Sequence, residues 1–238
     1  MSWPRGAAIV CPFLEPAMIR IASKLRIARM ATFCLVHGAW HGGWAWDPLR
    51  AELAARGHAV VAPDLPCDDC DAGIDAYAAC VRDALGGVDD AVVVGHSLGG
   101  LTIPLVPARV RVFLCALVAG TGWEGVFVPG FGDARRRDEL GRSYYPDPAD
   151  AARELQYPPG AEALAARLRP QAAVGAGAGE PRGPVAYVVC ARDAVIRPEW
   201  QRHLARDVLG VEPIELDAGH SPMLSHPREL AELLDRLA

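Results

Sequence analysis

The sequence predicts an α/β protein in which a mainly parallel, doubly wound sheet of about six recognisable strands carries a small helical cap. Apolar runs and helical segments alternate along most of the chain, as they do in units of strand, helix and parallel strand. The apolar runs lack the period-two alternation of a strand with one solvated face, so helices should cover both faces of the sheet. One long break in the alternation predicts the cap.

The first half of the chain predicts three strands and two helices. Strands are expected at residues 32–36, 58–62 and 91–94, with helices at about 46–56 and 74–85 between them. Glycine follows both helical patterns, which is a common way for a helix to end. The third strand therefore leads directly into the glycine-rich segment that begins at residue 95.

The second half predicts three further strands, at residues 110–118, 185–190 and 211–216, and a closing helix at 227–237. Between about 121 and 183 two helices are expected, at 147–155 and 161–168, and no strand is evident. Because this insertion falls at the ligand-facing edge of the sheet, it is interpreted as the cap.

The 238 residues fit one domain over residues 31–238, with the cap inserted at about 121–183. Residues 1–30 are interpreted as an N-terminal extension separate from the fold, because Met30 directly precedes the first convincing strand. The apolar stretch within this extension is too short to span a bilayer.

Charge and cysteine content disfavour several functions. The net charge of -5 is scattered, so neither nucleic acid nor a membrane is expected as a partner. The longest charge run, residues 135–139, is interpreted as a solvated face. The seven cysteines are an odd number, and several lie in apolar runs, which predicts a cytoplasmic protein without disulfides. Cys67 and Cys70 form an isolated C-x-x-C that is interpreted as a plain loop.

Ser97 lies at the centre of Gly95-x-Ser97-x-Gly99, between the third strand and an apolar stretch at residues 101–106. In this context the motif is typical of a nucleophile elbow, whose glycines let strand and helix approach closely. A serine nucleophile needs a base, an acid that orients the base, and donors for the oxyanion. Each of these partners is therefore expected elsewhere along the chain.

The base should come last in chain order, and His220 directly follows the sixth strand. His37 and His41 precede the nucleophile and are weaker candidates. The acid should end the strand after the insertion, where Asp193 lies, although a loop carboxylate or a helix cap is its alternative role. Asp217 is the competitor, but it is too close in sequence to His220 to approach the imidazole from a neighbouring strand end.

Two backbone N–H groups are expected to bind the oxyanion. One belongs to Leu98, which follows the nucleophile, and the other to Ala39 in the loop after the first strand. Gly38 should allow the close approach of this loop. The tryptophans that follow, Trp40, Trp44 and Trp46, are expected to pack the loop rather than touch substrate.

These residues resemble the α/β-hydrolase superfamily from about residue 31 to the C-terminus. Segments 37–44, 95–100 and 217–221 are similar to the branch that contains plant methylesterases and hydroxynitrile lyases, with bacterial esterase-like relatives. The resemblance implies an α/β-hydrolase fold, a catalytic triad of Ser97, Asp193 and His220, and an oxyanion hole of Ala39 and Leu98. The lyases of this branch carry threonine where this chain has Gly38 and lysine where it has Ser221.

The expected function is hydrolysis of a small carboxylic ester by a carboxylesterase-type serine hydrolase, through an acyl-enzyme and without a metal or cofactor. Two alternatives stay open: a non-hydrolytic enzyme of the same fold, such as a cyclase or a C–C or hydroxynitrile-type lyase of a bacterial pathway, and a triad-retaining ligand-binding receptor. No pattern in the sequence fixes the acyl group, the alcohol group or the oligomeric state.

Aromatic residues of the cap suggest an apolar or aromatic ester as the small-molecule substrate, although packing within the cap accounts for them equally well. These residues are Trp123, Phe127, Phe131, Tyr144, Tyr145 and Tyr157.

Overall fold

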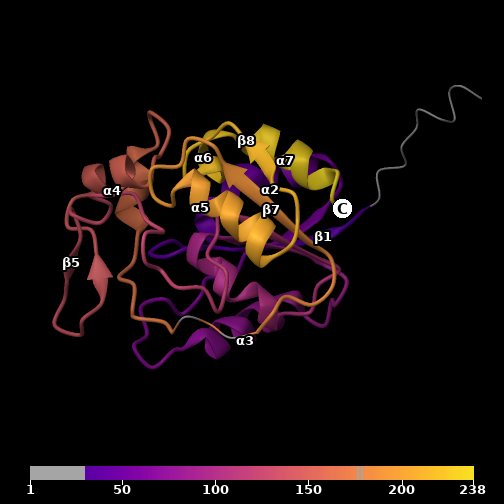
Figure 1. The fold of residues 1–238 in the computed structure, drawn as a ribbon, viewed down its shortest axis with the longest axis horizontal. Helices are drawn as coiled ribbons and strands as arrows, with labels where there is room; N and C mark the ends of the chain where they lie inside the picture. Colours follow the sequence, from indigo (N-terminus) through magenta and orange to yellow (C-terminus); the bar gives the residue numbers. More distant parts are fainter. Residues whose placement is uncertain (1–29, 176, 178) are drawn as a thin grey trace, which may run out of the picture.

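The computed structural model describes residues 30–175, 177 and 179–238, so nearly all of the expected N-terminal extension lies outside the described residues. Six parallel strands form one sheet in the order β2-β1-β3-β4-β7-β8 (Figure 1). The strands are β1 (Thr32–Val36), β2 (Ala59–Val61), β3 (Val92–His96), β4 (Val110–Leu114), β7 (Val185–Cys190) and β8 (Ile214–Leu216). The prediction of a parallel α/β sheet is confirmed.

Helices cover both faces of this sheet. The helices that pack against it are α2 (Asp47–Ala55), α3 (Ile74–Leu85), α5 (Pro198–His203), α6 (Pro222–Ser225) and α7 (Pro227–Asp235). Helices α2, α6 and α7 bury their apolar residues against one face, and α3 packs against the other. In β1, Phe33 and Leu35 belong to the first core and Cys34 and Val36 to the second, which explains why the strand is apolar throughout. None of the described helices combines the length and hydropathy needed to cross a bilayer.

The segment after Ser97 does not form one continuous α-helix. Two 3₁₀ helices, Ser97–Leu101 and Ile103–Leu105, follow β3. Pro104 has no N–H to donate to the carbonyl of Gly100, and its ring would crowd that carbonyl, so a regular α-helix does not continue through this segment.

The insertion between β4 and β7 contains more than the two expected helices. Its elements are β5 (Arg136–Arg137), β6 (Ser143–Tyr144), α4 (Pro148–Glu154) and the 3₁₀ helix η4 (Glu162–Arg167). In Figure 1, β5 and α4 lie beyond one end of the sheet. The expectation that this region has no strand is wrong, because β5 and β6 form an antiparallel pair. Strands of two residues carry no periodic pattern. The turn between them is held by Asp138, whose carboxylate accepts hydrogen bonds from the backbone and side chain of Arg142.

Candidate active site

Ser97 follows β3 directly, at the carboxyl end of a central strand. Its φ angle is 51°, in the left-handed region that residues with a side chain rarely adopt. A Cβ on Gly99 would lie 2.6 Å from the carbonyl oxygen of Val36, and one on Gly95 would lie 2.9 Å from the carbonyl oxygen of Gly99. Both positions therefore need glycine for the turn to close as it does.

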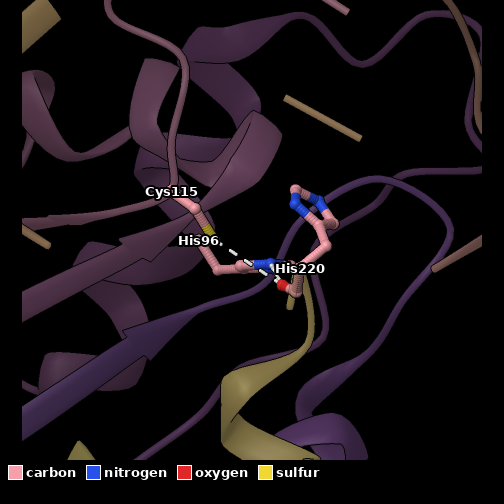
Figure 2. A group of neighbouring side chains, drawn as sticks. All are labelled: His96, Cys115 and His220. Atoms are coloured by element: carbon pink, nitrogen blue, oxygen red, sulfur yellow. Dashed lines mark hydrogen bonds between the residues drawn. The ribbon is translucent and has the colours of Figure 1, made fainter. Parts of the chain in front are cut away.

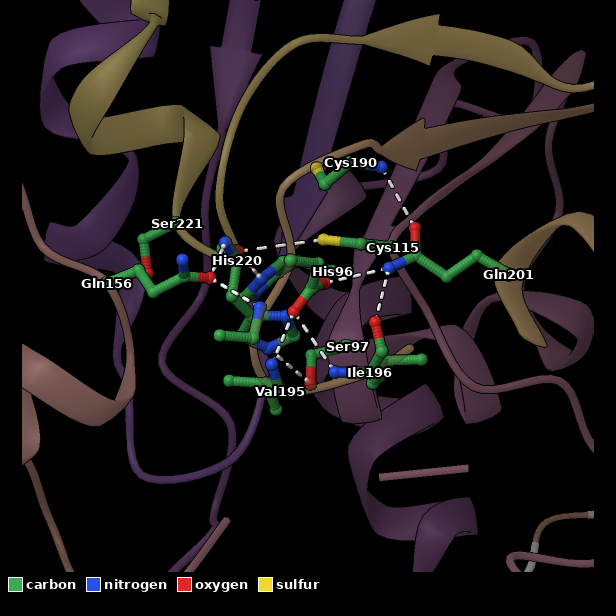
Figure 3. Close-up of polar contacts among 12 residues, drawn as sticks. His96, Ser97, Cys115, Gln156, Cys190, Val195, Ile196, Gln201, His220 and Ser221 are labelled. Atoms are coloured by element: carbon green, nitrogen blue, oxygen red, sulfur yellow. Dashed lines mark hydrogen bonds and ion pairs between the residues drawn. The ribbon is translucent and has the colours of Figure 1, made fainter. Parts of the chain in front are cut away.

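A chain of hydrogen bonds joins Ser97, His220 and Asp193. Figure 3 shows the hydrogen bonds around Ser97 and His220. Nε2 of His220 lies 3.1 Å from Oγ of Ser97, and Nδ1 lies 2.8 Å from Oδ2 of Asp193. The three residues follow β3, β8 and β7, so the parallel sheet brings them to the same edge. Because an ionised carboxylate only accepts hydrogen bonds, Nδ1 carries the hydrogen and Nε2 is left to accept the serine hydroxyl.

The two carboxylates that compete for the role of acid lie in different environments. The side chain of Asp193 is fully buried, and its Oδ1 accepts the backbone N–H groups of Val195 at 2.7 Å and Ile196 at 3.0 Å. The side chain of Asp217 is 80% exposed and forms an ion pair with Arg192. The structure therefore brings Asp193, and not Asp217, to His220.

Two glutamines support this arrangement, and sequence reasoning missed both. Gln201, on α5, donates from Nε2 to Oδ2 of Asp193 at 2.8 Å, while its Oε1 accepts the N–H of Cys190 at 2.9 Å. Gln156, from the insertion, accepts the backbone N–H groups of His220 and Ala194 through one oxygen, each at 2.8 Å. Gln156 thereby ties together the loops that carry the base and the acid. Neither glutamine belongs to a motif, so only their three-dimensional placement reveals them.

His96 and Cys115 surround the backbone of His220 rather than its ring. Figure 2 shows Nε2 of His96 and Sγ of Cys115 directed at the carbonyl oxygen of His220, at 2.8 Å and 3.6 Å. One ligand-type atom from each of the three side chains falls within 4.8 Å of the others, a spacing that a metal ion could use. Burial raises the pKa of the Cys115 thiol well above its ordinary value, so the sulfur stays protonated. Both side chains therefore donate to the backbone of His220 and help to position it.

The loop after β1 packs directly on Ser97. A Cβ on Gly38 would lie 2.8 Å from Cβ of Ser97, so this position must be glycine for the loop to approach. Ala39 and Leu98, the two expected oxyanion donors, line the same cavity as Ser97. The structure thus brings the predicted donors and the predicted nucleophile to one place.

Two buried histidines support this loop through hydrogen bonds to its backbone. His37 donates from Nδ1 to the carbonyl of Gly38 at 2.8 Å and accepts the N–H of Leu65 at 2.9 Å. His41 donates from Nδ1 to the carbonyl of Ala39 at 2.8 Å and accepts the hydroxyl of Tyr157 at 2.8 Å. Desolvation by burial lowers the pKa of His37 to about 4 and that of His41 to about 3. Both rings are therefore neutral supports of the loop.

A cavity of about 250 Å³ lies beside Ser97, between the core loops and the insertion. Trp40 was expected only to pack its loop, but it lines this cavity. Its indole N–H donates to Oγ of Ser143 at 3.0 Å, which links the loop to β6. The lining residues are Ala39, Trp40, Ser97, Leu98, Leu117, Trp123, Phe127, Phe131, Arg135, Arg137, Ser143, Gln171, Ala172, Ala173, Val174 and Val195.

The six aromatic residues singled out in the insertion divide into two groups. Trp123, Phe127 and Phe131 line the cavity. Tyr145 instead donates its hydroxyl to Glu154, and Tyr157 donates to His41. Tyr144 lies on β6 and is absent from the lining.

Cys67 and Cys70, the isolated C-x-x-C, are separate thiols in the described structure. Cys67 is buried and Cys70 exposed, and the two are not joined by a disulfide. Burial raises the pKa of Cys67 to about 11, which is the opposite of what a reactive thiol needs.

The fold and this site define an enzyme built on a parallel α/β sheet with a serine, a histidine and a carboxylate at its carboxyl edge. Residues 35–233 match the alpha/beta hydrolase family, and the chain belongs to that family.

Curated relatives narrow the class further. Methylesterase 3 of Arabidopsis thaliana is 28% identical, with 86% of this chain and 94% of the relative covered. Salicylic acid-binding protein 2 of Nicotiana tabacum is 29% identical, with 87% and 96% covered. A carbendazim hydrolyzing esterase of Nocardioides is 37% identical over a shorter region, 44% of this chain and 46% of the relative. The chain is a carboxylesterase-type hydrolase of the branch that contains the plant methylesterases.

Solved structures agree on the fold. Polyneuridine aldehyde esterase superposes with a TM-score of 0.74 at 22% identity, over 88% of this chain and 99% of that chain. A pyrethroid hydrolase from Sphingobium faniae gives a TM-score of 0.71 at 24% identity, over 87% and 97%.

Proposed function

We propose that this enzyme hydrolyses a small carboxylic ester by covalent catalysis at Ser97. The observation that carries the proposal is the hydrogen-bonded chain from Ser97 through His220 to Asp193, whose serine end lines the cavity. Similarity to methylesterases supports a small ester as the substrate class. The free cysteines of the described residues are compatible with the cytoplasmic location that we also propose.

In the first half-reaction, Nε2 of His220 takes the hydroxyl proton as Oγ of Ser97 attacks the ester carbonyl. The backbone N–H groups of Ala39 and Leu98 bind the oxyanion that develops. His220 then gives its proton to the leaving alcohol oxygen, and the acyl group stays bonded to Ser97. In the second half-reaction, water loses a proton to His220 and attacks the acyl carbon, which releases the acid and restores the serine.

Asp193 keeps the hydrogen of His220 on Nδ1 and stabilises the imidazolium that forms in each half-reaction. Its own geometry is fixed by three donors, the N–H groups of Val195 and Ile196 and the amide of Gln201. An acid held in this way does not need to reorganise when the neighbouring ring becomes charged.

The position after the base favours hydrolysis over a lyase reaction. Ser221, which stands where the lyases of this branch carry lysine, is buried and donates its hydroxyl to the carbonyl of Leu155 at 2.6 Å. Its hydroxyl is therefore engaged by the backbone of Leu155, and it supplies no cation to the site. Gly38, where those lyases carry threonine, has no room for a side chain.

The test is turnover of short 4-nitrophenyl and methyl esters by the wild type and by Ser97→Ala. The expected result is wild-type turnover that falls by about 10⁴-fold or more in the variant, because the nucleophile is lost. Ser225→Ala is the matched control, since this serine lies on α6 and is absent from the cavity lining. Tight ligand binding with negligible wild-type turnover would instead identify a receptor and contradict the proposal.

A further inference from the structure

The cavity beside Ser97 holds positive charge that ester hydrolysis itself does not use. Among the described residues, Arg135 and Arg137 are the only charged members of its lining, and no carboxylate accompanies them. The arginine ion pairs of the insertion involve other residues, namely Arg142 with Asp138, Arg153 with Asp150 and Arg169 with Asp68. The charge run expected to be a solvated face therefore contributes two cations to the cavity.

Arg135 is held by aromatic rings rather than by a counter-ion. The central carbon of its guanidinium lies 5.0 Å from the ring centroid of Trp40 and 4.6 Å from that of Phe131. Nη2 makes a long hydrogen bond of 3.5 Å to the carbonyl of Phe131, and the buried Nε has no partner in the described part of the chain. Stacking of this kind fixes the plane of a guanidinium and leaves most of its donors available.

Arg137 lies next to Arg135 on the hairpin. It is exposed and sits opposite Ser143 in the β5·β6 pair, with Nη1 donating to the carbonyl of Gly141 at 2.6 Å. Arg135, Arg137 and Ser143 also line a second, adjoining cavity together with Gly132 and Arg136, so the two cavities meet at the three shared residues. The arginines thus stand where the main cavity continues toward the hairpin.

The acids of the insertion form no ion pair with either cation in the described structure. Glu154 accepts the backbone N–H groups of Gly132 and Ala134 at 3.2 Å and 3.1 Å, and the hydroxyl of Tyr145 at 2.9 Å. It forms no ion pair with Arg135 in the described structure. A partly buried cation with free donors and no ion-pair partner favours an anionic ligand, because both groups then regain the interactions that they lose with water.

Building on the esterase function, we propose that the substrate carries a carboxylate in addition to its ester group, and that Arg135 and Arg137 bind this carboxylate. The ester carbonyl lies at Ser97, and the apolar body of the substrate packs against Trp40 and Phe127. The substrate class is accordingly a half-ester of a dicarboxylic acid or an aromatic ester with a carboxylate substituent. The proposal narrows the substrate class expected from the sequence, which was an apolar or aromatic ester.

The experiment compares charged and neutral esters in matched pairs. One pair is the mono-4-nitrophenyl ester of glutaric acid against 4-nitrophenyl pentanoate, which places the carboxylate on the acyl side. The other is 4-carboxyphenyl pentanoate against phenyl pentanoate, which places it on the alcohol side. For each pair, kcat/KM of the charged ester is divided by kcat/KM of the neutral ester. In one of the two pairs this ratio should be about tenfold lower in Arg135→Gln than in the wild type, because a charge-assisted hydrogen bond is lost.

Two further variants separate charge from shape. Arg135→Lys should keep most of the wild-type ratio, since it retains the cation. Arg153→Gln removes the same charge from an exposed residue on α4 that lines neither cavity, and should leave the ratio close to that of the wild type. An unchanged ratio in Arg135→Gln and in the Arg135→Gln/Arg137→Gln double variant, or an equal fall in Arg153→Gln, would overturn the proposal.

A binding measurement decides the proposal without any turnover. Calorimetric titration of Ser97→Ala with benzoate and with the neutral isostere benzamide should give about tenfold tighter binding of benzoate, and Arg135→Gln should remove the difference. Equal binding of the two probes would overturn the carboxylate site. If neutral esters are hydrolysed with no preference for charge, the esterase function stands and only the carboxylate site fails.

Discussion

Lowering the pH from 7.5 to 5 should destabilise the folded enzyme through the buried histidines around the active site. His37, His41 and His96 are each almost completely buried. Desolvation by burial lowers the pKa of His37 to about 4, that of His41 to about 3, and that of His96 well below its ordinary value. In the unfolded chain all three rings bind a proton near pH 6.5.

Burial makes the folded state resist protonation, and the hydrogen bonds show which contacts a second ring proton would affect. Nε2 of His37 accepts the N–H of Leu65, and Nε2 of His41 accepts the hydroxyl of Tyr157. Their other nitrogens already donate to backbone carbonyls. A proton on Nε2 of His37 would place two donors face to face at Leu65, so charging that ring weakens the support of the loop that carries Ala39. The hydroxyl of Tyr157 can turn to accept from a protonated His41, so the cost of charging His41 is the burial of the charge.

The magnitude follows from proton linkage. The unfolded state binds more protons than the folded state below pH 6.5, so this stability is complete above that pH and is lost as the pH falls toward the folded-state pKa values. At pH 5 the loss is about 2 kcal/mol each for His37 and His41, or roughly 4 kcal/mol together, and His96 adds a loss of the same sign. That is a large part of the whole stability of an ordinary domain.

Urea unfolding at pH 7.5, 6 and 5 measures the effect as the free energy of unfolding. The loss of stability at pH 5 should be smaller by about 2 kcal/mol in His41→Gln, because this variant removes one of the buried rings. His203→Gln is the matched control, because His203 is exposed on α5 and should leave the dependence intact. A free energy of unfolding that does not change from pH 7.5 to 5 would show that the buried histidines do not destabilise the folded state at low pH.

Three substitutions near the site give further predictions. Asp193→Asn should lower kcat by about 10⁴-fold because the imidazole loses its orienting acceptor. The control Asp217→Asn should change kcat less than about twofold. Similar losses of kcat in both variants would contradict the assignment of Asp193 as the acid. Gln201→Leu should lower kcat by about tenfold and shift its pH profile with little change in KM, since Asp193 loses a donor; an unshifted profile would point to a merely structural role. Gly38→Ala should lower kcat by about 10²-fold because its Cβ displaces the oxyanion loop from Ser97, and a crystal structure of the variant with an unmoved loop and full activity would contradict this.

Chain order was sufficient to predict most of the site. Ser97, Asp193 and His220 each follow a predicted strand, and parallel strands place such positions at one edge of a sheet. Local glycine patterns also marked Gly38 and its loop. These features are local or follow from topology, so a single sequence reveals them.

The supporting residues could not be predicted in the same way. Gln156 and Gln201 reach their partners through contacts across the fold, and the sequence around them carries no motif. Arg135 and Arg137 look like solvated charges until the two-residue strand β5 folds them against the cavity. Such short strands are fixed by a turn and by side-chain hydrogen bonds, which leave no hydrophobic period to detect.

Covalent labelling tests directly whether Ser97 is the nucleophile. Wild-type protein is treated with a serine-directed fluorophosphonate and digested, and the modified peptide is identified by mass spectrometry. The adduct should lie on Ser97 and should be absent from folded Ser97→Ala. No labelling of folded wild type, or undiminished labelling of the variant, would show that Ser97 is not the nucleophile.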